Sequence, residues 1–168
     1  NMAFAKGGYS KCVRYNEEWK GADTISVSVS TGNLSGDNKF GYGTCNFQGA
    51  TTTASGTEIY LGGSSGNRFR LLDNSAVTWT AHVVAMNSAT GDAAGWTVSG
   101  VVKRGSGANT TAVVGANTTL TANTQGGLNT TPTFTADTTN GSLKVTVTGI
   151  NANTVYWNVR LDYSELRQ

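Results

Sequence analysis

Period-two alternation of apolar and polar side chains is the feature that most constrains this chain, because it places alternate residues on opposite faces of a β-strand. The clearest run lies near the C-terminus, where the alternating residues are Val155, Trp157, Val159, Leu161 and Tyr163. A second run spans residues 143–147, and the turn-rich segment 149–154 separates the two. This pattern predicts a β-hairpin formed by the two runs, with a turn at Asn140-Gly141 before the first of them.

The same alternation recurs upstream, around Trp79 and around Trp96, with a loop expected between them at residues 87–93. Trp79, Trp96 and Trp157 all fall among apolar neighbours, so we expect them in the core. Further strands are expected at residues 25–30, 57–61, 69–72, 111–121 and 133–137. Short strands at such close spacing, with no helical stripe, predict an all-β antiparallel β-sandwich of jelly-roll-like form.

The composition agrees with this fold and excludes several classes of function. Only 13% of the 168 residues are charged and 22 are glycine, which is unlike an ordinary helical protein. The net charge is +2 and the basic residues are scattered, so the basic stripe of a nucleic-acid-binding protein is missing. No stretch approaches the roughly 20 apolar residues that span a membrane.

The first third of the chain has a different sequence pattern, in which glycines separate isolated aromatic residues and little alternation is sustained. Such segments cannot bury their apolar side chains alone and need neighbouring copies to do so. We therefore expect residues 1–54 to form a Gly-rich trimerising β stalk and residues 55–168 to form the sandwich. Cys12 and Cys45 are the two cysteines, and their count leaves both a bridge and two free thiols open.

Reactive side chains are too few and too scattered for a catalytic or metal site. The single histidine, His82, falls on the strand face opposite Trp79 and has no evident set of partners. A zinc site needs several His or Cys ligands at short spacing, which Cys12, Cys45 and His82 do not supply. We expect a protein that is not an enzyme, with no catalytic residue, cofactor or metal.

Exposed aromatic residues and arginines are the best candidates for binding, because aromatic rings stack on sugars and guanidinium groups pair with acidic glycans. For the aromatic candidates, packing at a subunit interface is the competing interpretation, and we favour it for any one of them. The candidate residues for glycan binding or the trimer interface are Tyr9, Tyr15, Trp19, Tyr42, Tyr60, Arg68 and Arg70.

About two-thirds of the chain resembles the C-terminal tip domain of phage tail fibre and tailspike proteins. The segments that carry the resemblance are 57–63, 69–75, 78–85, 96–104, 111–115, 136–141, 143–149 and 155–159. The Gly-rich start, residues 5–22, is similar to the repeats that precede this domain in such proteins. The resemblance implies a homotrimer at the distal end of the virion, attached to the upstream part of the fibre. Its implied external partner is host cell-surface polysaccharide or lipopolysaccharide.

Two other functions compete with this interpretation. A secreted carbohydrate-binding module would be monomeric and would bind glycan through an aromatic platform. A self-cleaving chaperone domain of a tailspike would begin at a cut, and Asn1 is compatible with a cut or with a fragment boundary.

Overall fold

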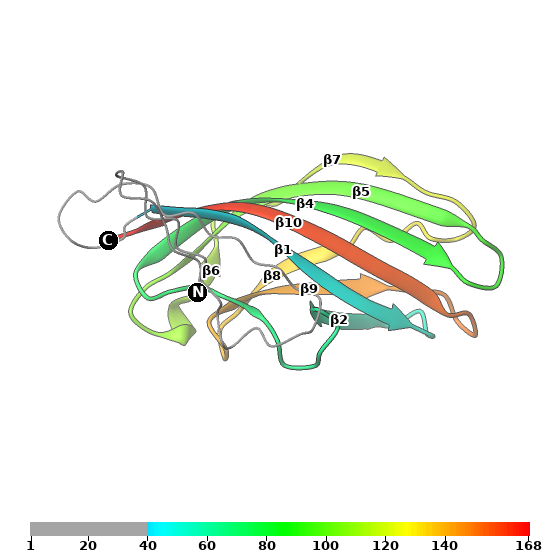
Figure 1. Ribbon diagram of the computed structural model, residues 1–168, viewed down its shortest axis with the longest axis horizontal. Coiled ribbons are helices and arrows are strands. Elements are labelled where there is room, and N and C mark those ends of the chain that lie inside the picture. The colour runs from blue at the N-terminus through cyan, green and yellow to red at the C-terminus, as the bar shows by residue number, and fades with distance from the viewer. Residues whose placement is uncertain (1–39) are drawn as a thin grey trace, which may run out of the picture.

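The structure, a computed structural model, describes residues 40–168. This part of the chain contains β-strands, one short 3-10 helix and no α-helix, and every strand pairing within it is antiparallel (Figure 1). The prediction of an all-β antiparallel fold is therefore confirmed for these residues. The elements are β1 (Phe40–Thr51), β2 (Gly56–Leu61), β3 (Phe69–Arg70), β4 (Ser75–Asn87), β5 (Ala93–Arg104), η2 (Ala108–Thr110), β6 (Ala112–Val113), β7 (Thr118–Asn123), β8 (Thr133–Asp137), β9 (Ser142–Thr148) and β10 (Val155–Arg167).

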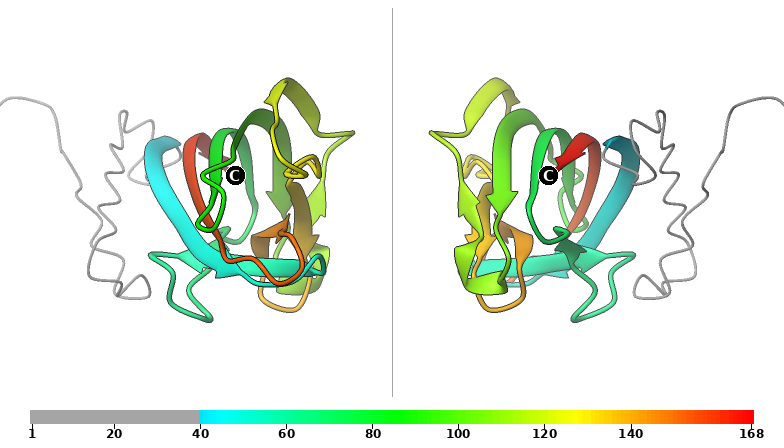
Figure 2. Two further views of the ribbon diagram at one scale, coloured as in Figure 1. Left: turned by 90° about the vertical axis from the view of Figure 1, so that its right-hand side faces the viewer. Right: turned by 90° about the vertical axis from the view of Figure 1, so that its left-hand side faces the viewer.

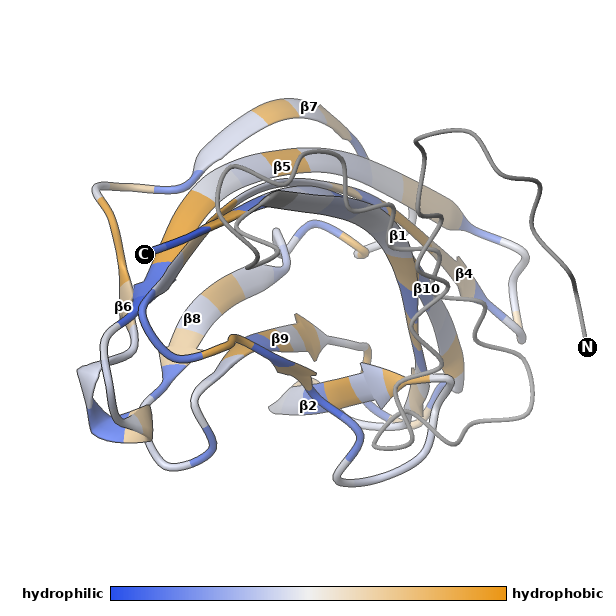
Figure 3. Cartoon of the chain, turned by 60° about the vertical axis from the view of Figure 1, so that its left-hand side comes forward, coloured by the Kyte–Doolittle hydropathy of each residue, from blue (hydrophilic) through white to orange (hydrophobic). Residues whose placement is uncertain are grey.

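The strands form one curled sheet with the order β3-β9-β2-β1-β10-β4-β5-β6, to which β7 adds beside β5 and β8 beside β9. The long strands β1, β10, β4 and β5 make an arch, and the shorter β2, β8 and β9 lie under its concave side (Figures 1 and 2). Bands of different hydropathy alternate along these strands (Figure 3). The core therefore lies between the arch and the short strands, and the convex side of the arch faces outward.

Burial follows the alternation that the sequence predicts. Trp79, Trp96 and Trp157 are each 2–3% exposed, which confirms their assignment to the core. Trp96 stacks on Trp157 with 5.9 Å between ring centroids, and Trp79 stacks on Phe134 of β8 at 4.6 Å. Burying one large apolar side chain contributes about 1.5–3 kcal/mol. The Trp79–Phe134 contact therefore helps to hold β8 against the arch, while the Trp96–Trp157 contact joins two strands of the arch itself.

The predicted hairpin between residues 143–147 and 155–163 is wrong. Both runs are strands, but β9 pairs with β2, β3 and β8, whereas β10 pairs with β1 and β4. Both edges of β10 are thus occupied by long strands that come from earlier in the chain. The segment 149–154 crosses from the short strands to the arch. The turn predicted at Asn140-Gly141 is confirmed, since it joins β8 to β9 with Gly141 at φ +66°.

Strand β1 includes residues that the sequence analysis placed in the N-terminal segment. All twelve of its residues pair with β10, while the predicted strand at 25–30 lies outside the described residues. Gly49 allows β2 to pack closely against β1, since a Cβ there would lie 2.5 Å from Ile59 Cγ2. At the end of β1, the Thr51 hydroxyl accepts a buried hydrogen bond of 3.0 Å from Trp157 Nε1.

Replacing Thr51 with valine tests this anchor. The shape is nearly kept, but Trp157 Nε1 loses its partner in a buried site, so unfolding should become easier by about 1–3 kcal/mol. Urea denaturation of Thr51→Val measures the change, and Thr135→Val, at an exposed position of β8, is the control. Equal stabilities of the two variants would contradict this role of the Thr51 hydroxyl.

The thiol of Cys45 is free and buried, 2% exposed, on the inner face of β1. Burial raises the pKa of the Cys45 thiol, and the nearby Asp162 carboxylate raises this pKa further. Cys12 lies outside the described residues. Because the thiolate is the reactive form, Cys45 is placed where it reacts least.

In a Cys12→Ser variant, which leaves Cys45 as the only thiol, we expect almost no reaction with Ellman's reagent at pH 8 in the folded state. One equivalent should react after addition of guanidinium chloride. Fast reaction of one equivalent in the folded protein would show that Cys45 is accessible.

Candidate functional site

The convex face of the arch carries the side chains that alternate with the core. The strand registers place them in rows across β1, β10, β4 and β5, as in the row Thr44–Asp162–Thr80–Ser99. Neighbouring strands are about 4.8 Å apart and successive rows about 6.6 Å, so side chains in a row are direct neighbours. We call this surface the outer face. Its side chains on the three strands β1, β10 and β4 are Tyr42, Thr44, Asn46, Gln48, Ala50, Tyr156, Asn158, Arg160, Asp162, Ser164, Leu166, Ala76, Thr78, Thr80, His82, Val84 and Met86.

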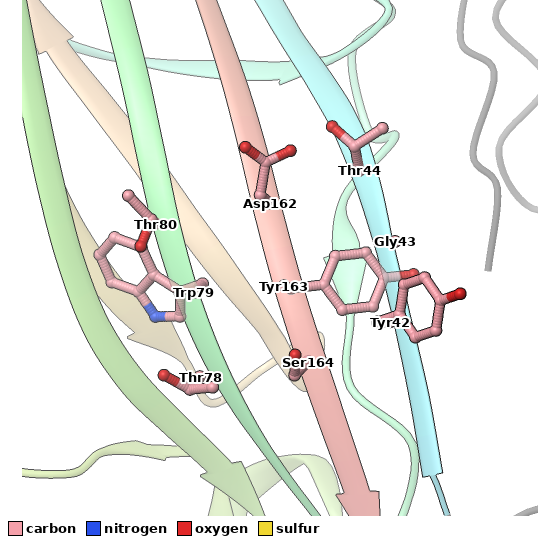
Figure 4. A pocket seen from close by; sticks show the side chains of 9 residues that line it. All are labelled: Tyr42, Gly43, Thr44, Thr78, Trp79, Thr80, Asp162, Tyr163 and Ser164. Carbon is pink, nitrogen blue, oxygen red and sulfur yellow. The ribbon is translucent and has the colours of Figure 1, made fainter. Parts of the chain in front are cut away.

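Two adjacent rows of the outer face form a groove of about 560 Å³, a size typical of small-ligand sites. Figure 4 shows the side chains that line it, which come from β1, β10 and β4. One row contains Thr44, Asp162 and Thr80, and the other contains Tyr42, Ser164 and Thr78. We call this site the hydroxyl groove, because five of these six side chains end in a hydroxyl group.

Tyr42 and Asp162 give the hydroxyl groove its chemical character. Tyr42 is 47% exposed, so its ring is open to a ligand. Thr44, which also lines the groove from β1, has a buried hydroxyl that forms no hydrogen bond within the described residues. Asp162 Oδ2 lies 2.9 Å from Arg160 Nη2 and 3.8 Å from His82 Nε2. These two neighbours, one row away, fix the carboxylate while leaving it partly exposed.

The sequence candidates fall in three different places. Tyr42 lies in the hydroxyl groove, and Tyr9, Tyr15 and Trp19 lie outside the described residues. Tyr60, Arg68 and Arg70 lie on and next to β2 and β3, and none of the three lines the groove. Of the four candidates that the structure describes, only Tyr42 therefore lies in the groove.

Arg68 is held in an ion-pair cluster. Its Nε atom lies 3.0 Å from Glu58 Oε1 and 3.4 Å from Asp137 Oδ2, and its guanidinium carbon lies 5.2 Å from the centroid of the Tyr60 ring. The Tyr60 hydroxyl donates a hydrogen bond of 3.2 Å to Glu58. Two carboxylates thus neutralise the arginine, which favours a structural role for Arg68 and Tyr60 over the binding of an acidic glycan. Arg70 is exposed on β3.

Five groove residues were not singled out from the sequence: Thr44, Thr78, Thr80, Asp162 and Ser164. Threonine and serine are common throughout this chain, so their type carries no signal. The strand alternation does place Thr78, Thr80 and Asp162 on the polar side of their strands. Only the pairing of β10 with both β1 and β4 brings the three strands together, and this pairing was not predicted.

Within residues 40–168, no three His, Cys, Asp or Glu side chains gather in a way that would hold a metal ion. No helix in this part of the chain is long and apolar enough to cross a membrane. In comparisons with known proteins, no family model and no curated protein matched the sequence.

Asp137 fixes the turn between β8 and β9. Its carboxylate accepts hydrogen bonds from the backbone N–H groups of Thr139 and Asn140, both at 3.0 Å, and from Asn140 Nδ2 at 2.7 Å. Burial alone would raise the pKa of Asp137, but the hydrogen bonds from Asn140 and Thr139 and the charge of Arg68 lower this pKa below its ordinary value of 3.8.

This lowered pKa predicts the pH dependence of stability. The unfolded chain binds a proton at Asp137 more readily than the folded protein does, so the stabilisation is complete above about pH 5 and is lost as pH falls below 4. Urea unfolding between pH 6 and pH 2.5 should therefore show a smaller loss of stability for Asp137→Asn than for the unchanged protein. Identical pH profiles would show that Asp137 has no lowered pKa.

Proposed function

We propose that this chain is the tip domain of a phage tail fibre or tailspike, a jelly-roll-like β-sandwich that forms a homotrimer and binds host cell-surface glycan. It would lie at the distal end of the virion, joined to the upstream part of the fibre, with host polysaccharide or lipopolysaccharide as its partner. The observation that carries the proposal is the hydroxyl groove, an open site with an exposed tyrosine on a continuous antiparallel sheet. Aromatic rings and hydroxyl groups on rigid strands suit a repeated sugar surface.

An exposed apolar cluster supports the assembly part of the proposal. Val84, Met86 and Tyr156 are 51–55% exposed and are adjacent on β4 and β10 at one end of the outer face. Contiguous exposed apolar side chains mark interaction surfaces. On β4, Val84 of the cluster follows Thr80 of the groove by four residues, about 13 Å along an extended strand, so a subunit contact confined to the cluster would leave the groove open.

The β7 edge supports assembly as well. All six residues of β7 are exposed, Leu120 among them at 61%, and the pairing found for this strand is with β5. No charged residue occurs between Arg104 and Asp137. An uncharged edge strand invites pairing with another chain unless something covers it, and subunit association is one way to cover it.

A monomeric carbohydrate-binding module is the second candidate. The observation that favours it is that three neighbouring strands, β1, β10 and β4, are sufficient to form a groove of about 560 Å³, so the site does not need a second subunit. The two functions share a ligand class and differ in assembly. The self-cleaving chaperone stays a prediction that the described residues do not favour.

Molar mass in solution separates the two candidates. Light scattering coupled to size exclusion should give a mass near three times the 17.5 kDa chain, and Met86→Asp should shift the mass toward the monomer, because it places a charge in the apolar cluster. The control is Thr135→Asp, an exposed position on β8, and circular dichroism checks the fold of both variants. A monomeric unchanged protein would favour the carbohydrate-binding module.

The recognition part is tested by binding the fluorescently labelled protein to a panel of whole bacterial cells. We expect binding to at least one strain, with loss of that binding when surface polysaccharide is stripped by periodate. If the protein binds no strain, host recognition is contradicted and only the proposed role in trimer formation remains.

A further inference from the structure

We infer that the hydroxyl groove binds a neutral saccharide unit, with Asp162 accepting hydrogen bonds from sugar hydroxyls and Tyr42 stacking on the ring. This inference rests on the proposed recognition of host glycan and specifies the chemistry of its ligand. It concerns the six side chains that form the groove floor in Figure 4.

The charge of the residues that line the groove argues against an acidic sugar. Asp162 is the one side chain with a formal charge among the residues that line the groove. The nearest cation, Arg160, is already paired with this carboxylate at 2.9 Å. Another cation, Lys103, lies on β5, the strand beyond β4, one row away from the row of Tyr42. It is not among the residues that line the groove. The carboxylate or phosphate of an acidic glycan would therefore be repelled by the Asp162 carboxylate, and Arg160, which could offset this repulsion, is already paired with Asp162.

The two oxygens of Asp162 have different surroundings. Both Arg160 and His82 approach Oδ2, and no hydrogen bond or ion pair among the described residues involves Oδ1. The Asp162 side chain is 43% exposed, so Oδ1 can accept hydrogen bonds from a ligand. A carboxylate held at one oxygen and open at the other is oriented before the ligand arrives, which lowers the entropic cost of binding.

The neighbours of Asp162 complete a surface suited to a polyol. Thr80 flanks it in its own row, opposite Thr44, whose hydroxyl is buried, and Ser164 and Thr78 lie in the next row beside Tyr42. Three strands and two rows give a floor of about 10 by 7 Å, which suits a short saccharide. Hydroxyl groups both donate and accept, so they can match the alternating donors and acceptors of a sugar.

The test measures affinity of the purified full chain for defined polysaccharides by biolayer interferometry. The neutral probes are dextran, yeast mannan and galactan, and the acidic probes are alginate, hyaluronan and polysialic acid. We expect binding to a neutral probe, weakened about tenfold or more by Tyr42→Ala and by Asp162→Asn, since each removes a main contact. Tyr42→Phe, which keeps the ring, should stay within about twofold of the unchanged protein by the same arithmetic.

Asp92→Asn is the matched control for the carboxylate, because Asp92 lies in the loop between β4 and β5, outside the groove lining. Its affinity should equal that of the unchanged protein. Binding to acidic probes alone, or neutral binding that Tyr42→Ala and Asp162→Asn leave unchanged, would overturn the inference while host recognition stands. If the protein binds none of the probes and none of the bacterial strains, both the inference and the proposed recognition are overturned.

Discussion

The pairing of β10 with β1 on one edge and β4 on the other is the constraint on which the rest of this structure depends. The thirteen residues of β10 are in register with all twelve of β1 and with all thirteen of β4. Because side chains alternate along a strand, this one register decides which residues enter the core and which face outward. A slip by one residue would expose Trp157 and Leu161 and bury Arg160 and Asp162, and both the exposed apolar area and the desolvation of the two charges would oppose it.

The same register gives the two faces of the arch different side chains, apolar on the inner face and mostly polar on the outer face. On the inner face, Val159 and Leu161 are fully buried in the hydrophobic core, which stabilises the sheet. On the outer face, Asp162 and Ser164 gain no core contacts and are free to serve binding. The apolar cluster and the hydroxyl groove occupy different parts of this face, so the proposed assembly and the proposed recognition would not compete for the same residues.

The sequence predicts the inner face of this fold better than its pairing. Alternation identified the strands around Trp79, Trp96 and Trp157 and their buried side chains, because core burial imposes a period of two. It did not predict β1, where Gly41, Gly43 and Gly49 interrupt the apolar positions Cys45 and Phe47.

Local alternation does not show which distant strands pair with one another. For this reason, the sequence wrongly predicted a hairpin between β9 and β10. For the candidate site, an exposed aromatic residue was a usable signal at Tyr42. The hydroxyl residues beside it became a site only through contacts between β1, β10 and β4, which are separated by many residues.

The most direct test of the central claim is a nuclear magnetic resonance titration of the isotope-labelled protein with a bound saccharide. The account predicts chemical-shift changes clustered at Tyr42–Thr44 of β1, Thr78–Thr80 of β4 and Asp162–Ser164 of β10, three segments that only this register brings together. Changes confined to the loops at either end of the sheet, or to the cluster around Arg68, would contradict it.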